Sequence, residues 1–302
     1  MEYIYYKAKQ GNFGDDLNAW LWPKFFGAHN TADDYLLGIG SILFNRSELL
    51  KSLQPKRKIV FGSGVRPDYV PLVIDNSWDI RFLRGPLSSA ALGNGYKYIS
   101  DAAYALRLTK DFKHFSSVQK KYEVSLMPYF HSVKYFDWKH ICEQLGYHYI
   151  SPLAEQGVEF TMQEIASSEK LITKAMHGAI VADALRVPWN RFVLSTPYTE
   201  GHMVSEFKWM DWLYSVQQCI YNPIHIKLYR SSIINTWVRT ITQNVVDVKF
   251  FLKGKVIKDV ITQLSAVNKY YLSGNDVVKD IDTGIQQQID KLNNQYTKYQ
   301  HI

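Results

Sequence analysis

Cysteine and long apolar runs are scarce in this chain of 302 residues, and each absence narrows what the chain can be. The two cysteines, Cys142 and Cys219, supply neither a disulfide framework nor a metal-ligand spacing, which is typical of a reducing compartment. No run of about 18 apolar residues is available to span a bilayer. The first residues, Met-Glu-Tyr-Ile-Tyr-Tyr, lack the basic and apolar regions of a secretory signal. We therefore expect a cytoplasmic protein in which both cysteines are small core residues.

Acidic residues are outnumbered, because 35 lysines and arginines face 28 aspartates and glutamates and give a net charge of +7. A positive surplus favours anionic partners, such as phosphorylated metabolites or anionic lipid headgroups. Nucleic acid is not expected as a partner, because zinc-finger spacings, RNP-like aromatic motifs and dense arginine runs are missing. Aromatic residues make up 15% of the chain, which suits stacking on sugar rings as well as ordinary core packing.

Motifs for common cofactors are also missing. The loop Gly38-Ile-Gly-Ser-Ile-Leu has no third glycine of a dinucleotide fingerprint, and Gly62-Ser-Gly is a tight turn that lets backbone amides approach a ligand. No Walker A loop, no Gly-x-Ser-x-Gly elbow and no His-x-x-x-His metal pair occurs. We therefore expect no NAD, no ATP and no bound metal.

Length and pattern predict an α/β chain of about two domains. Apolar runs end in glycine-bearing turns and alternate with helical patterns, as in a parallel doubly wound sheet. We predict strands over 2–8, 35–39, 57–61, 80–83, 123–127, 147–150, 170–173 and 191–194. We predict helices over 17–26, 135–145, 161–168, 177–187 and 204–216, and a further helix that follows residues 84–89 and ends at about 92. The pattern restarts after the lysine-rich stretch 109–121, so we place one Rossmann-like domain at 1–115 and a second at 116–223, with a cleft between their facing edges.

The remainder, residues 224–302, shows helical periodicity with few strand or turn signals, which predicts a helical extension. Apolar residues recur at helical spacing from Ile233 to Val248, and a Gln/Asn-rich helix near the end could pair with a second copy of the chain. The segment Lys249–Lys258 mixes phenylalanines with four lysines. This pattern suits a solvated helix packed on the domains or on a second subunit, and it also suits peripheral membrane contact.

The stretch Leu171–Trp189 carries the strongest candidate site. A short apolar run ends at Thr173, and His177 and Gly178 then open an alanine-rich helix that stops before Pro188. A side chain at such a junction stands at the carboxyl edge of a sheet, where open α/β folds bind ligands. The unpaired N–H groups of the first helical turn favour an anion beside them. His177 is therefore a candidate proton donor or phosphate ligand, and a histidine that only packs or caps the junction is the alternative.

Other candidates also follow predicted strands. Asp15 and Asp16 begin a helix after the first strand, where one could act as a general base or both could simply cap the helix. Arg84 directly follows a strand, and its guanidinium suits a bidentate grip on carboxylate or phosphate, with a surface ion pair as the alternative. His131 follows the strand that ends in Met-Pro-Tyr-Phe and is placed for a cleft.

Six motifs occur in a fixed order over roughly residues 3–215. They are Asn12-Phe-Gly-Asp-Asp-Leu-Asn18, Gly38-Ile-Gly-Ser-Ile-Leu43, Phe61-Gly-Ser-Gly-Val65, Arg84-Gly-Pro-Leu-Ser88, Met176-His-Gly-Ala-Ile180 with Ala184-Leu-Arg-Val-Pro188, and Phe207-Lys-Trp-Met-Asp-Trp212. Together they resemble the polysaccharide pyruvyl transferase family, closest to its bacterial exopolysaccharide ketal pyruvate transferases.

The resemblance implies a fold similar to glycosyltransferase type B, with two Rossmann-like domains and the active site between them. It implies phosphoenolpyruvate as donor, a sugar in a lipid- or nucleotide-linked oligosaccharide as acceptor, and no metal or other cofactor. The family's histidine maps onto His177, and one of its arginines maps onto Arg84. Ala175 stands where many relatives carry an arginine, so a second donor-binding cation must come from elsewhere; the candidates are Lys174, Arg186 and Lys208.

We therefore predict a cytoplasmic pyruvyl transferase of cell-surface polysaccharide synthesis, at the inner face of the membrane if its C-terminal helices contact lipid. A glycosyltransferase that uses a nucleotide sugar and a non-catalytic, membrane-held assembly protein are the alternatives. The predicted catalytic residues are His177, Asp15 and Asp16. The predicted substrate-binding residues are Arg84, Asn12, Gly14, Gly40, Ser63, Lys174, Lys208 and His131.

Overall fold

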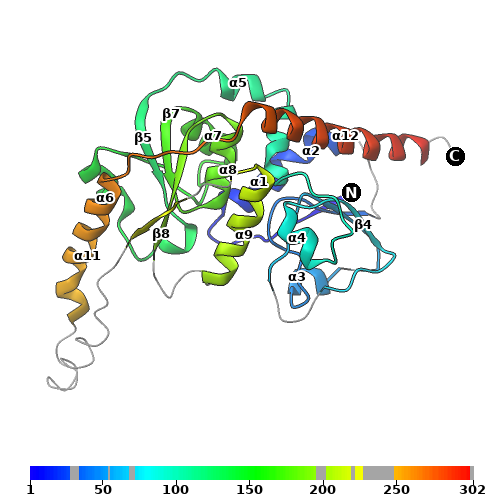
Figure 1. The fold of residues 1–302 in the computed structure, drawn as a ribbon, viewed down its shortest axis with the longest axis horizontal. Helices are drawn as coiled ribbons and strands as arrows, with labels where there is room; N and C mark the ends of the chain where they lie inside the picture. Colours follow the sequence, from blue (N-terminus) through cyan, green and yellow to red (C-terminus); the bar gives the residue numbers. More distant parts are fainter. Residues whose placement is uncertain are drawn as a thin grey trace.

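The computed structural model describes residues 1–27, 34–53, 55–67, 72–194, 202–218, 222–226 and 248–299. It contains two parallel β-sheets, one of four strands and one of five, with helices packed around them (Figure 1). This arrangement confirms the predicted α/β class with two parallel sheets. The more specific likeness to glycosyltransferase type B stays a prediction.

The first sheet has its strands in chain order, and every neighbouring pair is parallel. Its two central strands are almost entirely buried, as strands covered on both faces must be. The strands are β1 (Glu2–Ile4), β2 (Asp34–Leu37), β3 (Arg57–Phe61) and β4 (Trp78–Phe82). The accompanying helices are α1 (Phe13–Leu21), α2 (Pro23–Phe26), α3 (Glu48–Lys51) and α4 (Pro86–Ala91).

The second sheet is also parallel, with the strand order β6-β5-β7-β8-β9. Its strands are β5 (Tyr122–Met127), β6 (His148–Tyr149), β7 (Ser168–Thr173), β8 (Trp189–Leu194) and β9 (Ile224–Ile226). Its helices are α6 (Trp138–Leu145), α7 (Val158–Ala166), α8 (Met176–Ala184) and α9 (His202–Ser215). Between the sheets, the chain forms the 3₁₀ helix η1 (Ala102–Leu108) and the short helix α5 (Phe112–Ser116), and a second 3₁₀ turn, η2 (Phe130–Ser132), follows β5.

Each strand predicted before residue 195 has a counterpart in the structure, and the strand at 57–61 matches β3 at both ends. The helix predicted over 17–26 is different. It begins earlier, at Phe13, because the Asn12 side chain caps it by accepting the Gly14 N–H group. It is divided at Trp22, where Pro23 opens α2.

The expectation that the chain becomes helical from residue 224 is wrong at its start. Ile224–Ile226 form β9, which pairs in parallel with β8 and completes the second sheet. Ile226 is buried whereas His225 is exposed, so this Ile-His-Ile segment follows the two-residue period of a strand. The predicted helical face over 233–245, Cys219, and the side chains of 248–253 and 255 lie outside the described residues; Cys142 is a buried core residue as expected.

Two C-terminal helices, α11 (Val248–Ser265) and α12 (Asn275–Tyr299), pack on different parts of the molecule. The α11 helix lies against α6 and β9, where Val260 and Leu264 are buried. The α12 helix crosses the top of the molecule in Figure 1 toward the first sheet, where the Tyr296 hydroxyl donates to Asp34 at 2.5 Å. Its apolar face is buried in the chain's own core and needs no second copy to cover it. Within the described ranges, no helix is long and apolar enough to cross a membrane.

A continuous hydrophobic core joins the two halves. Phe61 of the first sheet and Leu171 of the second belong to one cluster of buried apolar side chains. The α9 helix strengthens this connection, because Trp209 lies in the shared cluster while Phe207 packs against the apolar residues of the first sheet. The α9 helix therefore fixes the position of the two sheets relative to each other, and the site described next lies between them.

Candidate functional site

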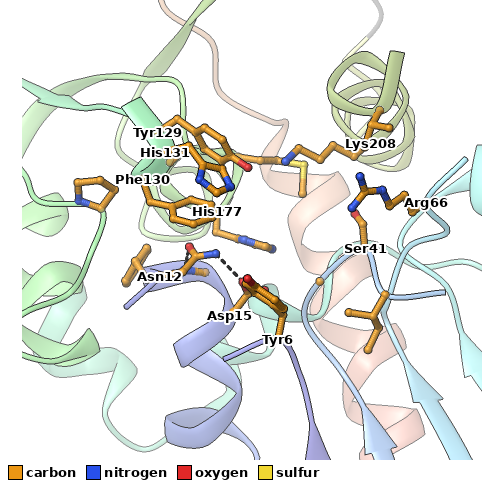
Figure 2. A pocket seen from close by; sticks show the side chains of 18 of the residues that line it. Tyr6, Asn12, Asp15, Ser41, Arg66, Tyr129, Phe130, His131, His177 and Lys208 are labelled. Atoms are coloured by element: carbon orange, nitrogen blue, oxygen red, sulfur yellow. Dashed lines mark hydrogen bonds between the residues drawn. The ribbon is translucent and has the colours of Figure 1, made fainter. Parts of the chain in front are cut away.

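A pocket of about 350 Å³ lies where the strands of both sheets end, which is where open α/β sheets bind ligands. The first half contributes the loop after β1, the start of α1 and the turns after β2 and β3. The second half contributes the segments after β5, β6 and β7, together with α9 (Figure 2). The lining residues are Tyr6, Asn12, Phe13, Gly14, Asp15, Gly40, Ser41, Ile42, Arg66, Met127, Tyr129, Phe130, His131, Pro152, Ala175, Met176, His177, Val204 and Lys208.

The start of α1 is built by a reciprocal cap. The Asn12 side chain accepts the Gly14 N–H group at 3.3 Å, while the Asp16 carboxylate accepts the Asn12 N–H group at 3.0 Å. Asp16 is thereby committed to the backbone and is not among the described residues that line the pocket. The prediction that Asp16 is catalytic therefore loses its geometric basis, because the cap turns its carboxylate toward the start of the helix.

Asp15 faces the pocket and receives a hydrogen bond from the Asn12 amide (Figure 2). Burial is the main influence on this carboxyl and raises its pKa to about 6, with a further small increase from Asp16. The charges of His177 and Lys208 and the bond from Asn12 act in the opposite direction. A carboxyl with a pKa near 6 can accept and release protons close to neutral pH, as a general base must.

His177 lies in the first turn of α8 and points into the pocket (Figure 2). Its ring fits closely against α1, since a Cβ atom placed on Gly14 would lie only 2.0 Å from its Nδ1 atom. Its Nε2 atom faces the buried carboxylate of Asp101, with 3.6 Å between Nε2 and Oδ2. Only glycine leaves this space at position 14, so Gly14 shapes the pocket through the side chain that it lacks.

Positively charged side chains line the wall of the pocket that faces Asn12 (Figure 2). Figure 2 shows Arg66 and Lys208 near each other, across the pocket from Asn12, while His131 lies on the same side as His177. The Arg66 side chain is exposed, so its guanidinium can move to meet a ligand. Guanidinium and ammonium groups at a pocket edge suit carboxylate and phosphate ligands.

Tyr129 lies next to two ammonium groups. The Nζ atom of Lys174 is 4.6 Å from the centroid of its ring, and the Nζ atom of Lys208 is 5.4 Å from it. Lys174 is mostly buried and, unlike Lys208, does not belong to the described lining of the pocket. Of these two predicted ligands, the structure therefore brings only Lys208 to the pocket wall, because Lys174 is directed onto the tyrosine face.

Arg84 does not reach the pocket, contrary to our expectation. Its side chain is fully buried, with Nε 3.0 Å from Asp211 Oδ2 on α9 and Nη1 donating to Ser41 Oγ at 2.6 Å. The guanidinium occupies space left by Gly64, where a Cβ atom would lie 2.1 Å from Arg84 Cζ. Arg84 therefore lies behind Ser41, and Ser41 is the residue of the two that lines the pocket. The carboxylate that the arginine binds belongs to the protein itself.

Two further predicted residues have structural partners instead of a place in the pocket wall. Ser63 is fully buried and donates its hydroxyl to the carbonyl groups of Leu37 and Gly38, which fixes the turn after β3. Arg186 follows the far end of α8 and donates to the Ser273 carbonyl at 2.6 Å. Both side chains satisfy backbone carbonyl groups that are distant in the sequence, and neither residue is among the described lining.

Arg66, Tyr6, Ser41 and Tyr129 line the pocket but were not predicted. The signal for Arg66 was available, because it follows the Gly62-Ser-Gly turn after β3 just as Arg84 follows β4. Ser41 lies within the Gly38–Leu43 motif and could have been chosen with Gly40. Nothing in the sequence around Tyr6 or Tyr129 separates these two tyrosines from the other tyrosines of the chain.

The chain is 36% identical over 216 residues to the succinoglycan biosynthesis protein ExoV of Rhizobium meliloti (strain 1021). The chain is therefore similar to that protein but spans less than two thirds of its length. The match covers 70% of this chain and 64% of that relative, and it confirms the resemblance to polysaccharide pyruvyl transferases that the motifs indicate. No family model and no solved structure matches the chain.

Proposed function

We propose that this protein is a pyruvyl transferase, which moves the pyruvyl group of phosphoenolpyruvate onto a sugar of an exopolysaccharide precursor and forms a ketal. The observation that carries this proposal is the pairing of Asp15 and His177 inside one pocket, with Arg66 and Lys208 at its edge. An acid, a base and anion-binding cations are what this reaction requires. The relationship to a succinoglycan biosynthesis protein supports the polysaccharide context.

In this proposal the donor binds on the cationic side of the pocket. Phosphoenolpyruvate carries a phosphate and a carboxylate on the same enol carbon, so at least two positive groups must converge on it. Arg66 and Lys208 supply positive charges, His131 adds an imidazole ring, and the Ser41 hydroxyl offers a hydrogen bond. The N–H groups at the start of α8 add a fixed positive potential beside His177.

His177 and Asp15 divide the proton transfers. His177 gives a proton to the methylene carbon of the donor as a sugar hydroxyl attacks the central carbon and transfers its proton to Asp15. Phosphate then departs, taking up the proton held by Asp15, and a second hydroxyl of the same sugar closes the ketal ring. The proton of this second hydroxyl returns to His177, which restores the starting state and balances the reaction.

The acceptor binds at the open side of the pocket, where aromatic rings are available. The Tyr6 side chain is 56% exposed, and Tyr129 and Phe130 line the opposite wall. Flat aromatic faces suit the apolar faces of sugar rings. We propose a lipid- or nucleotide-linked oligosaccharide as the acceptor, which for a lipid-linked sugar places the protein at the inner face of a membrane.

The test is to incubate the full chain with phosphoenolpyruvate and candidate linked oligosaccharides, and to measure the acceptor by mass and phosphate by release. The proposal predicts an acceptor heavier by one pyruvyl ketal, together with one phosphate released for each ketal formed. Transfer of a sugar from UDP- or GDP-sugars without pyruvyl transfer would instead identify a glycosyltransferase. A protein that none of these ligands stabilises against heat would be a non-catalytic assembly protein.

A further inference from the structure

Asp101 is a buried carboxylate that no predicted motif includes. Its Oδ1 atom accepts the Ala103 N–H group at 3.0 Å and so caps η1. Its Oδ2 atom lies 3.6 Å from Nε2 of His177, and among the described residues neither of these two atoms has a hydrogen-bond partner. Leaving a buried polar atom without a partner costs on the order of 1–3 kcal/mol. The closeness of Oδ2 and Nε2 therefore indicates that the two atoms attract each other when the imidazole is charged.

The His177 ring has one buried side and one side toward the pocket. Nε2 is shielded from solvent on the Asp101 side. Nδ1 lies on the side of Gly14, whose backbone lines the pocket and leaves no space for a larger residue. The nitrogen that can reach a bound molecule is therefore Nδ1, while the nitrogen that Asp101 can hold is Nε2.

The charge on Asp101 is favoured by its neighbours. Burial alone would raise the pKa of this carboxyl, but the charges of His177 and Arg84 and the hydrogen bond from the Ala103 N–H group outweigh burial and hold the pKa below its ordinary value. Asp101 is then an anion beside the imidazole. Nε and Nη1 of Arg84 bond to Asp211 and Ser41, and the guanidinium acts on Asp101 through its charge.

Other charged groups line the pocket beside the imidazole or lie on a helix packed against α8. Asp15 faces it from α1 and Lys208 lies across the pocket on α9. On α7, which also packs against α8, Glu164 is bonded to His148 at 2.7 Å and is not available to the site. The negative groups are thus divided, with Asp15 on the pocket side and Asp101 on the buried side.

We propose that Asp101 is a positioning residue that holds the Nε2–H group of His177, so that Nδ1 is the nitrogen that delivers the proton to the substrate. In the transfer, the Nδ1–H bond breaks and a C–H bond forms at the methylene carbon of the donor. The ring is left neutral with its proton on Nε2, facing Asp101. The identity of the proton acceptor rests on the proposed function, whereas the position of the proton on the ring does not.

The test is nitrogen-15 NMR of the full chain labelled at histidine, with the His177 signals assigned by their loss in His177→Gln. In the neutral ring of the wild-type protein, we expect the proton on Nε2 and not on Nδ1. In Asp101→Asn, the side-chain oxygen keeps the Ala103 N–H group, so the new NH₂ group faces Nε2 and must donate to it. The proton then moves to Nδ1.

A wild-type ring with its proton on Nδ1 would overturn the inference, and so would an identical tautomer in the folded Asp101→Asn variant. The wild-type spectrum decides the question even if that variant does not fold. Asp183→Asn is the matched control, because Asp183 is equally buried but bonds to Tyr104 and Trp189. This control lowers stability without changing the His177 tautomer.

Kinetics give a second, separable readout. We expect Asp101→Asn to lower kcat by roughly 10²–10⁴ with little change in the KM for phosphoenolpyruvate, because a misplaced proton impairs the chemical step and not donor binding. An unchanged kcat contradicts the positioning role. If the wild-type protein forms no ketal at all, the proposed function fails, while the NMR result still decides the role of Asp101.

Discussion

Arg84 and Asp211 form a fully buried ion pair, with 3.0 Å between Arg84 Nε and Asp211 Oδ2. The pair ties the turn after β4 to α9, and so connects the first sheet with the helix that carries Lys208 to the pocket. Asp211 also accepts the Ser88 N–H group at 2.9 Å, and Arg84 donates to Ser41 in the pocket wall. An arginine predicted to bind the substrate therefore joins the two halves of the site.

Removing this arginine should destabilise the protein. Arg84→Met leaves Asp211 as an uncompensated buried charge, so we expect the free energy of unfolding to fall by about 3–5 kcal/mol in a urea titration. Arg81→Met is the control, since Arg81 bonds to the partly exposed Asp79 and should cost less. An Arg84→Met protein of unchanged stability with a greatly raised KM for phosphoenolpyruvate would show instead that Arg84 binds the donor.

Asp15 should control the acidic side of the pH profile. As a general base it must be ionised, and burial raises its pKa to about 6, so kcat/KM should rise with pH through this value. Asp15→Asn should lower turnover by roughly 10²–10⁴ and abolish this limb. Asp16→Asn removes a charge in the same helical turn while keeping an oxygen that can accept the Asn12 N–H group, and it serves as the control that retains the acidic limb. An Asp15→Asn variant with a normal profile removes Asp15 from the mechanism.

Replacing the Asp15 carboxyl should also stabilise the folded protein above a pH of about 6. Its pKa is raised from 3.8 to about 6 on folding, so the folded state holds a proton that the unfolded state has lost between these values. Stability contributed by this group therefore declines as the pH rises through about 6, and above it the ionised, buried Asp15 is unfavourable. We expect Asp15→Asn to be more stable than wild type at pH 8 by on the order of 1–3 kcal/mol, and to lose this advantage near pH 4. Urea titrations at both pH values test the sign.

Gly14 tests whether the position of the His177 ring matters. Gly14→Ala places a Cβ atom 2.0 Å from Nδ1, so the ring must move. Because a displacement of about 1 Å in a catalytic group costs roughly 10²-fold, we expect kcat to fall by about that factor. Gly95→Ala is the control, since an added Cβ there meets nothing within 4 Å. Equal activity of the two variants would show that the ring need not be held against α1.

Arg66 tests the donor side of the pocket. Loss of a charge-assisted hydrogen bond costs about 1.5–3 kcal/mol, so Arg66→Gln should raise the KM for phosphoenolpyruvate by roughly 10–100-fold and affect the acceptor less. Lys51→Gln removes a positive charge from the exposed Lys51–Glu48 pair on α3 and should leave KM unchanged. Equal KM values for Arg66→Gln and wild type would exclude Arg66 from donor binding.

Local patterns predicted the sheets and the centre of the site well. Apolar runs fixed the strands, and the position of His177 directly after β7 placed it in the pocket. The sequence could not indicate which charges neutralise each other inside the protein. Asp211 lies 127 positions after Arg84, and Asp101 lies far from His177 in the chain, so only folding shows that these side chains meet.

The claim that His177 protonates the donor while its pyruvyl group is transferred can be followed with a deuterium label from the solvent. The protein is incubated in D₂O with phosphoenolpyruvate and a linked oligosaccharide acceptor, and the ketal methyl group is examined by NMR and mass. We predict one deuterium in that methyl group with the wild-type protein and no ketal with His177→Gln. A ketal methyl group without deuterium, or full transfer by His177→Gln, would contradict the claim.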